Sequence, residues 1–383
     1  METRYTYPLR PEADLLLDIL NARSPCFDQS LDVERFVTLA KLHDLAPLVF
    51  CRLQHHNHPF SKKASPLLRS GYLSSLMMNL KFWNEFLKIN EAFQQSGIDM
   101  VPLKGMDILV RFYPTFDLRS MVDIDIVVKE SQFAQAEKIL SDLHYLKRLD
   151  GLKEGYWRDK QCHIAFFKNG VLVEVHWGLD FKRGHRAILP QLWERTRQLD
   201  FEHYKIDIFS PEDALFSFAL HLRRFGNILS LKQVLDVARI IKDYPGFDWG
   251  YVLKEAAQGR MKATLYFILM QVKLFTKTKI PSEVFRKLGI PAWQKVRIRN
   301  FLLKRTFQIE PALKKDYLSA HFLLYDNLCE PALYIINIPY EQFCKFYGLK
   351  PYTHKASLIY KLRLIYMLIS LFIKKKRRVH CSN

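Results

Sequence analysis

The chain has 383 residues, of which 49% are apolar and 14% aromatic, and its net charge is +19 from 58 Lys and Arg against 39 Asp and Glu. This composition excludes an intrinsically disordered chain and leaves room for two or three packed units. The positive charge favours polyanionic partners such as nucleotides, nucleic acid or anionic lipid, although lysines on solvated helix faces give the same total.

The cysteines and the absence of long apolar segments bear on location. The six cysteines show neither Cys-x-x-Cys spacing nor a His at zinc-finger distance, so we expect reduced, mostly buried thiols. Residues 1–14 lack the apolar core of a signal peptide, and no stretch reaches the ~18 apolar residues that a transmembrane helix needs. Together these features predict a cytoplasmic protein.

The N-terminal part of the chain is expected to be helical. Apolar residues recur at helical spacing from about residue 11 to residue 94, and the longest of these helices is expected over 65–94. Ser96 and Gly97 then end it. This part shows no motif with a recognisable chemistry.

The next stretch, 100–128, carries the first candidate site residues. It predicts a strand that ends at Lys104-Gly105, a short helix over 107–112, an irregular link through Arg119 and a second strand over 122–128. Side chains alternate between the faces of a strand, so Asp123 and Asp125 share one face, and Val122, Ile124 and Ile126 are expected to pack on the other.

Asp123 and Asp125 are candidate metal ligands. Two carboxylates on one face of a half-buried strand repel each other, and a divalent cation with oxygen ligands, usually Mg²⁺, relieves that repulsion. The competing interpretation is a pair of aspartates on a solvated sheet face, which needs no metal.

A β-hairpin gives the third candidate carboxylate. A helix over 131–143 precedes two strands, 162–168 and 171–177, that are joined by Asn169-Gly170, the dipeptide favoured in type I′ turns. A two-residue turn pairs Ala165 with Glu174 and His163 with His176, so Glu174 and both histidines lie on one side of the hairpin. The competing interpretation is an exposed glutamate with two packed histidines.

The rest of the chain is expected to be helical after a last strand over 204–209. Residues 364–373 are apolar except for Ser370, and five consecutive basic residues come next at 374–378. This end of the chain fits a core helix with a solvated tail, a helix at an anionic membrane surface, or a nucleic-acid-binding tail, and the sequence favours the first. We expect three regions: an N-terminal helical region (1–97), a mixed core (98–209) and a C-terminal helical region with a basic tail (210–383).

Several ordered motifs together resemble one known family. They are Leu-Lys-Gly at 103–105, Arg119 ahead of DIDIVV at 123–128, His163 on a strand, and VEVHW at 173–177. They resemble the uncharacterised nucleotidyltransferase family of the polymerase beta-like superfamily, over about residues 35–245. The helical segment that carries His221 and Asp236 also resembles the segment after the catalytic domain in that family.

The resemblance implies an α+β fold, with a small mixed sheet of nucleotidyltransferase type flanked by N-terminal and C-terminal helices. It matches Asp123 and Asp125 to the paired carboxylates of the superfamily and Glu174 to its third acidic position, where they would hold Mg²⁺, with two ions expected. The wider superfamily has Gly-Ser in its phosphate loop and a shorter interval to the aspartates, whereas this chain has Lys104-Gly105-Met106 and a longer one.

The implied activity is transfer of a nucleoside monophosphate from a nucleoside triphosphate, ATP as the first expectation, to an unidentified hydroxyl acceptor with release of pyrophosphate. Lys104, Gly105 and Arg119 are the expected nucleotide contacts. His163 and His176 are expected to orient Glu174 or to contact the acceptor.

Two other functions compete with this one. A glycosyltransferase also uses Asp-x-Asp, but it needs alternating strands and helices where this chain is helical. A non-catalytic binding module on the same fold would bind nucleic acid or an anionic surface. Peripheral membrane contact through the C-terminal basic helix is less favoured than nucleic acid as its partner.

Overall fold

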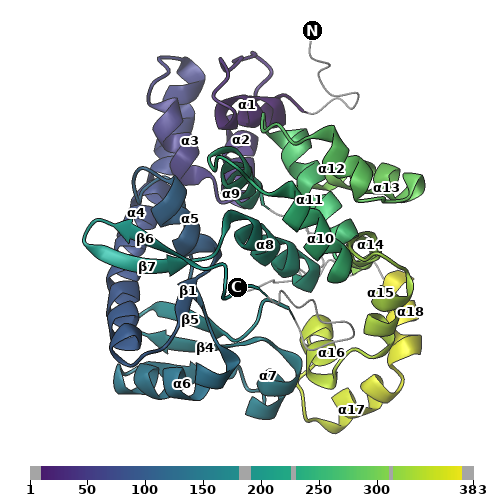
Figure 1. Ribbon diagram of the computed structural model, residues 1–383. Coiled ribbons are helices and arrows are strands. Elements are labelled where there is room, and N and C mark those ends of the chain that lie inside the picture. The colour runs from purple at the N-terminus through teal and green to yellow at the C-terminus, as the bar shows by residue number, and fades with distance from the viewer. Residues whose placement is uncertain (1–9, 181–190, 226–229, 310–313, 373–383) are drawn as a thin grey trace.

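The computed structural model describes residues 10–180, 191–225, 230–309 and 314–372. The basic tail at 374–378 lies outside the described residues. Helices occupy the chain before residue 96 and after residue 210, and the strands lie between them (Figure 1). The N-terminal helices are α1 (Pro11–Leu20), α2 (Val33–Leu42), α3 (Ala46–Leu53) and α4 (Pro59–Gln95).

The central sheet has five strands in the order β1-β2-β5-β4-β3. Strand β2 runs parallel to β5, and the other neighbours are antiparallel, so the sheet is mixed. Strands β6 and β7 form a separate two-stranded sheet, and β7 lies against β1. The strand bounds are β1 (Met100–Pro102), β2 (Ile124–Val128), β3 (Leu146–Arg148), β4 (His163–Lys168), β5 (Val171–His176), β6 (Arg197–Phe201) and β7 (Tyr204–Ile208).

Helices flank the sheet and continue from it to the end of the described chain. Between the strands lie α5 (Lys104–Phe112), η1 (Glu130–Gln132), α6 (Phe133–Asp142) and α7 (Glu154–Lys160). After the strands come α8 (Pro211–Phe225), α9 (Leu231–Lys242), α10 (Trp249–Gln258), α11 (Lys262–Phe275), α12 (Ser282–Lys287), α13 (Ala292–Arg305), α14 (Lys314–Leu324), α15 (Cys329–Ile336), α16 (Tyr340–Tyr347), α17 (His354–Lys361) and α18 (Arg363–Phe372). The α+β class with a small mixed sheet flanked by helices is confirmed.

The predicted hairpin and its register are confirmed. Asn169 and Gly170 have φ values of 50° and 79°, the left-handed conformations that a type I′ turn requires of both central residues. Ala165 pairs with Glu174 and His163 pairs with His176. The local turn chemistry therefore fixes which residues of β4 and β5 share a face.

The starts of α4, α5 and β2 differ from the sequence prediction, and several other bounds differ by one or two residues. Helix α4 begins at Pro59 and continues through Pro66, because burial of Phe60, Ala64 and Leu68 outweighs the one backbone hydrogen bond that a helical proline removes. Helix α5 begins at Lys104. Strand β2 begins only at Ile124, so the prediction that Val122 packs on the apolar face is wrong, and its side chain is 53% exposed.

Some elements were not predicted at all. Strand β3, helix α7 and strand β6 have polar or charged sequences, and Leu146 at the start of β3 is 73% exposed. The expectation of mostly buried thiols is also wrong, because Cys26 and Cys329 are exposed while Cys162 and Cys344 are buried. Strand β3, helix α7 and strand β6 are held in place by the strands next to them, because their own sequences lack a regular spacing of apolar residues.

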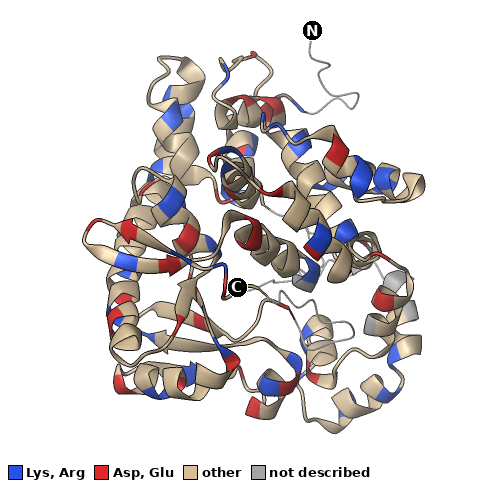
Figure 2. Ribbon diagram, viewed as in Figure 1, with Lys and Arg blue, Asp and Glu red and all other residues tan. Residues whose placement is uncertain are grey.

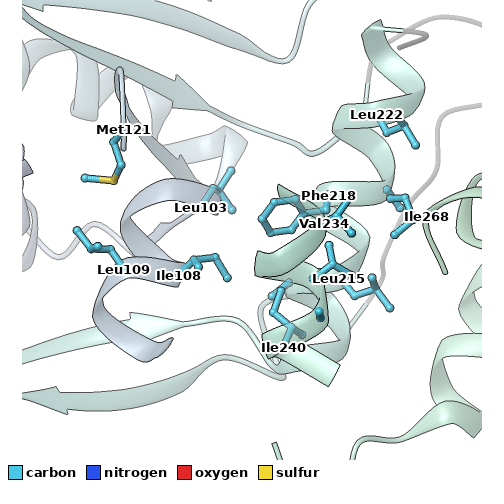
Figure 3. Close-up of a cluster of buried hydrophobic side chains, with 14 of the residues drawn as sticks. Leu103, Ile108, Leu109, Met121, Leu215, Phe218, Leu222, Val234, Ile240 and Ile268 are labelled. Atoms are coloured by element: carbon cyan, nitrogen blue, oxygen red, sulfur yellow. The ribbon is translucent and has the colours of Figure 1, made fainter. Parts of the chain in front are cut away.

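One contiguous hydrophobic core joins the sheet to the helices on both sides of it in the sequence. Figure 3 shows the contact of α5 with the C-terminal helices, where Ile108 faces Phe218 of α8 and side chains of α9. Because this core includes residues from Leu15 to Leu324, the three predicted regions share their packing. The predicted region boundaries at 97 and 209 stay a prediction.

A smaller cluster holds the last helices together. It consists of Ile338, Phe343, Tyr347 and Met367, which come from the α15–α16 link, α16 and α18. Within the ranges that the structure describes, no helix is both long and apolar enough to cross a lipid bilayer.

Phe218→Ala tests the contact between the sheet unit and α8. Phe218 is fully buried, so the truncation should lower the free energy of unfolding by about 3–5 kcal/mol, the usual cost of a large cavity. Urea unfolding measures the change, with Met77→Ala as control because Met77 is 71% exposed on α4. Equal midpoints for the two variants would contradict this packing.

Candidate metal and nucleotide site

The pairing of β2 with β5 brings two of the predicted carboxylates together. Asp125 of β2 is in register with Glu174 of β5, and neighbouring residues of paired strands project from the same face of a sheet. The β4–β5 hairpin then adds His176 and His163 beside them. Asp125 and both histidines are buried, and Glu174 is partly buried.

Asp125 lies at the centre of this group. Its Oδ1 atom lies 3.0 Å from the Lys104 ammonium and 2.9 Å from Nε2 of His176. Burial opposes ionisation of Asp125, but the charge of Lys104 and the hydrogen bond of His176 outweigh it and lower the pKa of the carboxyl to about 2. Asp125 is therefore ionised, with two cationic partners on one oxygen.

Glu174 and the two histidines complete the group. Glu174 Oε2 lies 3.5 Å from His176 Nε2, and its Oε1 lies 3.6 Å from His163 Nε2. The two imidazole rings stack with their centroids 5.0 Å apart. Burial disfavours the imidazolium form of His176, but its hydrogen bonds, first of all that to Asp125, raise its pKa to about 10.

Three ligand atoms are close enough to share one cation. Single donor atoms of Asp125, Glu174 and His176 all lie within 4.8 Å of one another. Asp123, which directly precedes β2, is not part of this group. Its pKa is nevertheless raised to about 8, by burial and then by the charges of Asp125 and Glu174, which places its carboxyl in the same negative field.

Lys104 and Gly105 give a physical reason for the Leu-Lys-Gly motif. Lys104 opens α5 with a φ of 44°, an uncommon left-handed conformation for a residue with a side chain, and its ammonium reaches back to Asp125. A Cβ atom on Gly105 would lie 2.9 Å from Sδ of Met121 and 3.3 Å from Nη1 of Arg119. The glycine therefore lets these two side chains approach the start of the helix.

Arg119 is buried and paired with an acid from the C-terminal helices. Its Nη2 donates to Asp236 of α9 over 2.7 Å, its Nε donates to the same carboxylate, and Tyr113 also donates to it. Asp236 thus fixes Arg119 against Gly105. The prediction that Arg119 contacts nucleotide stays a prediction, as do the roles assigned to Lys104 and Gly105.

Two further residues of the site were missed by sequence reasoning. Lys232 of α9 contributes positive charge to Asp123, and its Nζ donates to the carbonyl oxygen of Ser120. The sulfur of Cys162 lies 4.0 Å from Nδ1 of His176. Cys162 directly precedes His163 in the predicted hairpin, so register alone could have placed it, whereas Lys232 had no local signal.

A separate cavity lies between α3 and α4. It has a volume of about 670 Å³ and is lined by residues of α3, the link after it and the start of α4, including His55, His56, Lys62 and Arg69. Asp123, Asp125 and Glu174 do not line it. The acidic group and this cavity are therefore different features of the molecule.

Similarity to known proteins covers the part of the chain that holds the site. A family model described as an uncharacterised nucleotidyltransferase matches residues 29–277, which is more than half of the chain. The chain belongs to this nucleotidyltransferase family. The match contains every candidate site residue, and it confirms the resemblance drawn from the motifs together with the nucleotidyltransferase type of the mixed sheet.

No curated protein matches the chain. Among solved structures, it is similar to the antibiotic-resistance factor ANT(2'')-Ia, with 12% sequence identity and a TM-score of 0.36. That match covers 48% of this chain and 92% of the other. A likeness this distant carries no residue roles across.

Asp236→Ala tests the buried ion pair with Arg119. Removing one partner leaves an uncompensated buried guanidinium, so the free energy of unfolding should fall by about 3–5 kcal/mol. The double variant Arg119→Met with Asp236→Leu should recover most of that loss, because it removes both charges. Chemical denaturation measures both variants, and a double variant no more stable than Asp236→Ala would show that the pair is not the cause.

Asp123→Asn tests the negative field at the site in metal-free protein. Between its ordinary pKa of 3.8 and its folded-state pKa of about 8, Asp123 binds a proton only in the folded state. Its contribution to stability therefore falls as pH rises through that window, and asparagine removes this loss. The melting temperature of Asp123→Asn should exceed that of the parent by a margin that grows from pH 5 to pH 8, as calorimetry can measure.

The exposed Asp159 of α7 supplies the matched control for this comparison. Asp159→Asn should show no such growth in its margin over the parent. A flat margin for Asp123→Asn as well would mean that neither burial nor the charges of Asp125 and Glu174 raise the pKa of Asp123.

Proposed function

We propose that this protein transfers a nucleoside monophosphate from a nucleoside triphosphate to a hydroxyl acceptor in a Mg²⁺-dependent reaction that releases pyrophosphate. The observation that carries the proposal is the convergence of Asp125 and Glu174 from two adjacent parallel strands, with Asp123 beside them, in a chain of a nucleotidyltransferase family. We also propose that ATP is the donor and that the protein acts in the cytoplasm.

The donor set fits a divalent cation. Carboxylate oxygens are the ligands that Mg²⁺ prefers, and donor atoms of Asp125 and Glu174 lie within 4.8 Å of each other. Burial and then the charges of Asp125 and Glu174 raise the pKa of Asp123, and a bound cation would lower it. Asp123, Asp125 and Glu174 would hold the metal, with two ions proposed. When bound, Mg²⁺ neutralises triphosphate charge and polarises the α-phosphate.

Lys104 is a candidate contact to the triphosphate. Its ammonium lies 3.0 Å from Oδ1 of Asp125. A cation bound to Asp125 would compete for this carboxylate, and the ammonium would then contact the triphosphate. Helix α5 adds to this, because no side chain caps its first backbone N–H groups, which can bind phosphate oxygens beside Gly105.

Glu174 is the proposed acceptor of the proton. An oxygen of the acceptor hydroxyl attacks the α-phosphorus, the bond from that phosphorus to the bridging oxygen breaks, and pyrophosphate leaves while the hydroxyl proton passes to Glu174. His163 and His176 contact the two oxygens of Glu174 and so orient it. Arg119, held by Asp236, is the proposed guanidinium contact to phosphate.

A non-catalytic binding module on the same fold is the second candidate, and the net charge of +19 is the observation that favours it. Lys and Arg are spread over many helices and are mixed with acidic residues (Figure 2). Such a module would bind nucleic acid with a steep salt dependence and would release no pyrophosphate. A pyrophosphate-release assay separates the two candidates.

Asp123→Asn also tests the proposed metal dependence. The parent should bind ATP in calorimetric titration only with Mg²⁺ present, and the variant should lose at least about tenfold in affinity because ligand charge sets the affinity for the ion. Asp123 is the better test position than Asp125, whose removal would leave Lys104 and His176 as unbalanced buried cations.

Asp159→Asn is the control and should bind ATP as the parent does. A panel of α-labelled triphosphates, incubated with cell extract, then identifies the donor and the labelled acceptor. Unchanged Mg²⁺-dependent binding by Asp123→Asn would contradict the proposed metal site.

A further inference from the structure

The last helices of the chain expose an apolar face. On α15, Leu333 and Ile336 are exposed at 55% and 42%, and over α17–α18 the same is true of Leu358, Leu362 and Ile365 at 53%, 52% and 59%. Leu333 and Ile336 are three residues apart and so lie on one side of α15, whereas Leu358, Leu362 and Ile365 lie on α17, on the link after it and on α18. We call these five residues the C-terminal apolar face.

The two parts of this face are neighbours in space. Arg363, at the start of α18, donates from Nε to the carbonyl oxygen of Ile336 at the end of α15 over 3.0 Å. Helices α15 and α18 lie side by side at the edge of the molecule (Figure 1). The hydrogen bond therefore brings the exposed Ile336 of α15 close to Leu362 and the start of α18, with Leu358 one turn before Leu362 in the chain. Clustered exposed aliphatic side chains of this kind usually mark an interaction site.

The other side of these helices is packed. Tyr360, Tyr366 and Met367 lie against Phe343 and Tyr347 of α16. The helices are therefore held in place by their own small core, and the C-terminal apolar face is the side left over. The sequence favoured a core helix for 364–373; Met367 of this stretch is buried in the small core, whereas Leu364 and Ile365 are 48% and 59% exposed.

Positive charge exceeds negative charge in the helices that carry this face. Between Cys329 and Phe372 the chain has five basic residues, Lys345, Lys350, Lys355, Lys361 and Arg363, against two acidic ones, Glu330 and Glu341. Lys361 and Arg363 directly flank Leu362 of the apolar face. An exposed aliphatic face beside an excess of positive charge is the combination that binds an anionic bilayer surface.

We propose that helices α15, α17 and α18 dock this protein on an anionic lipid surface, with the C-terminal apolar face against the acyl chains and Lys355, Lys361 and Arg363 at the headgroups. Nucleic acid would satisfy the positive charge but would leave the exposed leucines and isoleucines in water. A second copy of the chain would cover them but would bring two positively charged surfaces together. An anionic bilayer satisfies both features and needs no membrane-spanning helix.

Vesicle co-sedimentation of the full chain tests the proposal. The protein should sediment with vesicles of phosphatidylcholine mixed with phosphatidylglycerol, and much less with phosphatidylcholine alone, and added salt should release it. The double variant Leu362→Glu with Ile365→Glu should lose at least about tenfold in partitioning. The matched control is Met77→Glu with Leu80→Glu, which adds the same charge on exposed apolar positions of α4.

Hydrogen exchange of the unmodified protein gives a readout that does not depend on how the variants fold. Amides over 354–367 should exchange more slowly with the anionic vesicles and unchanged with the neutral ones. Retention of vesicle binding by the double variant Leu362→Glu with Ile365→Glu would overturn the proposal. Protection of 354–367 by RNA, or by self-association at high protein concentration, instead of by vesicles would also overturn it. Nucleotide binding by the same variant should be unchanged, so the proposal and the proposed function fail independently.

Discussion

The buried charges around Asp125 are the constraint on which the site depends. A carboxylate inside a protein is costly unless cationic or hydrogen-bonding partners surround it, and here Lys104 and His176 both lie on one of its oxygens. Lys104 comes from the strand-to-helix turn, Asp125 from β2 and His176 from β5. One ion cluster therefore joins three segments that the chain brings together only on folding.

The same cluster explains why the surrounding backbone is unusual. Lys104 occupies a left-handed conformation, and its ammonium contacts Asp125. Gly105 leaves space for the side chains of Met121 and Arg119. Arg119 is held in turn by Asp236 from α9. Helix α9 is thus part of the site, which agrees with the hydrophobic core that joins α8, α9 and α11 to the sheet.

Sequence reasoning reached those features that local chemistry determines. Asn169-Gly170 dictates a two-residue turn, and with it the register that places His163, Glu174 and His176 on one side. It did not reach the parallel pairing of β2 with β5, the Lys104–Asp125 contact or the Arg119–Asp236 pair, because each joins residues far apart in the chain. The start of β2 was placed too early, since alternation of Val122 with Asp123 looks like strand although Val122 is exposed.

The most direct test of the site is a crystal structure with Mn²⁺ and a non-hydrolysable ATP analogue, in which anomalous scattering locates the metal. The proposal predicts a metal peak between Asp125 and Glu174, with the analogue's phosphates beside Lys104 and Gly105. Bound analogue with no metal at these carboxylates, or metal and analogue together at another place in the protein, would contradict it.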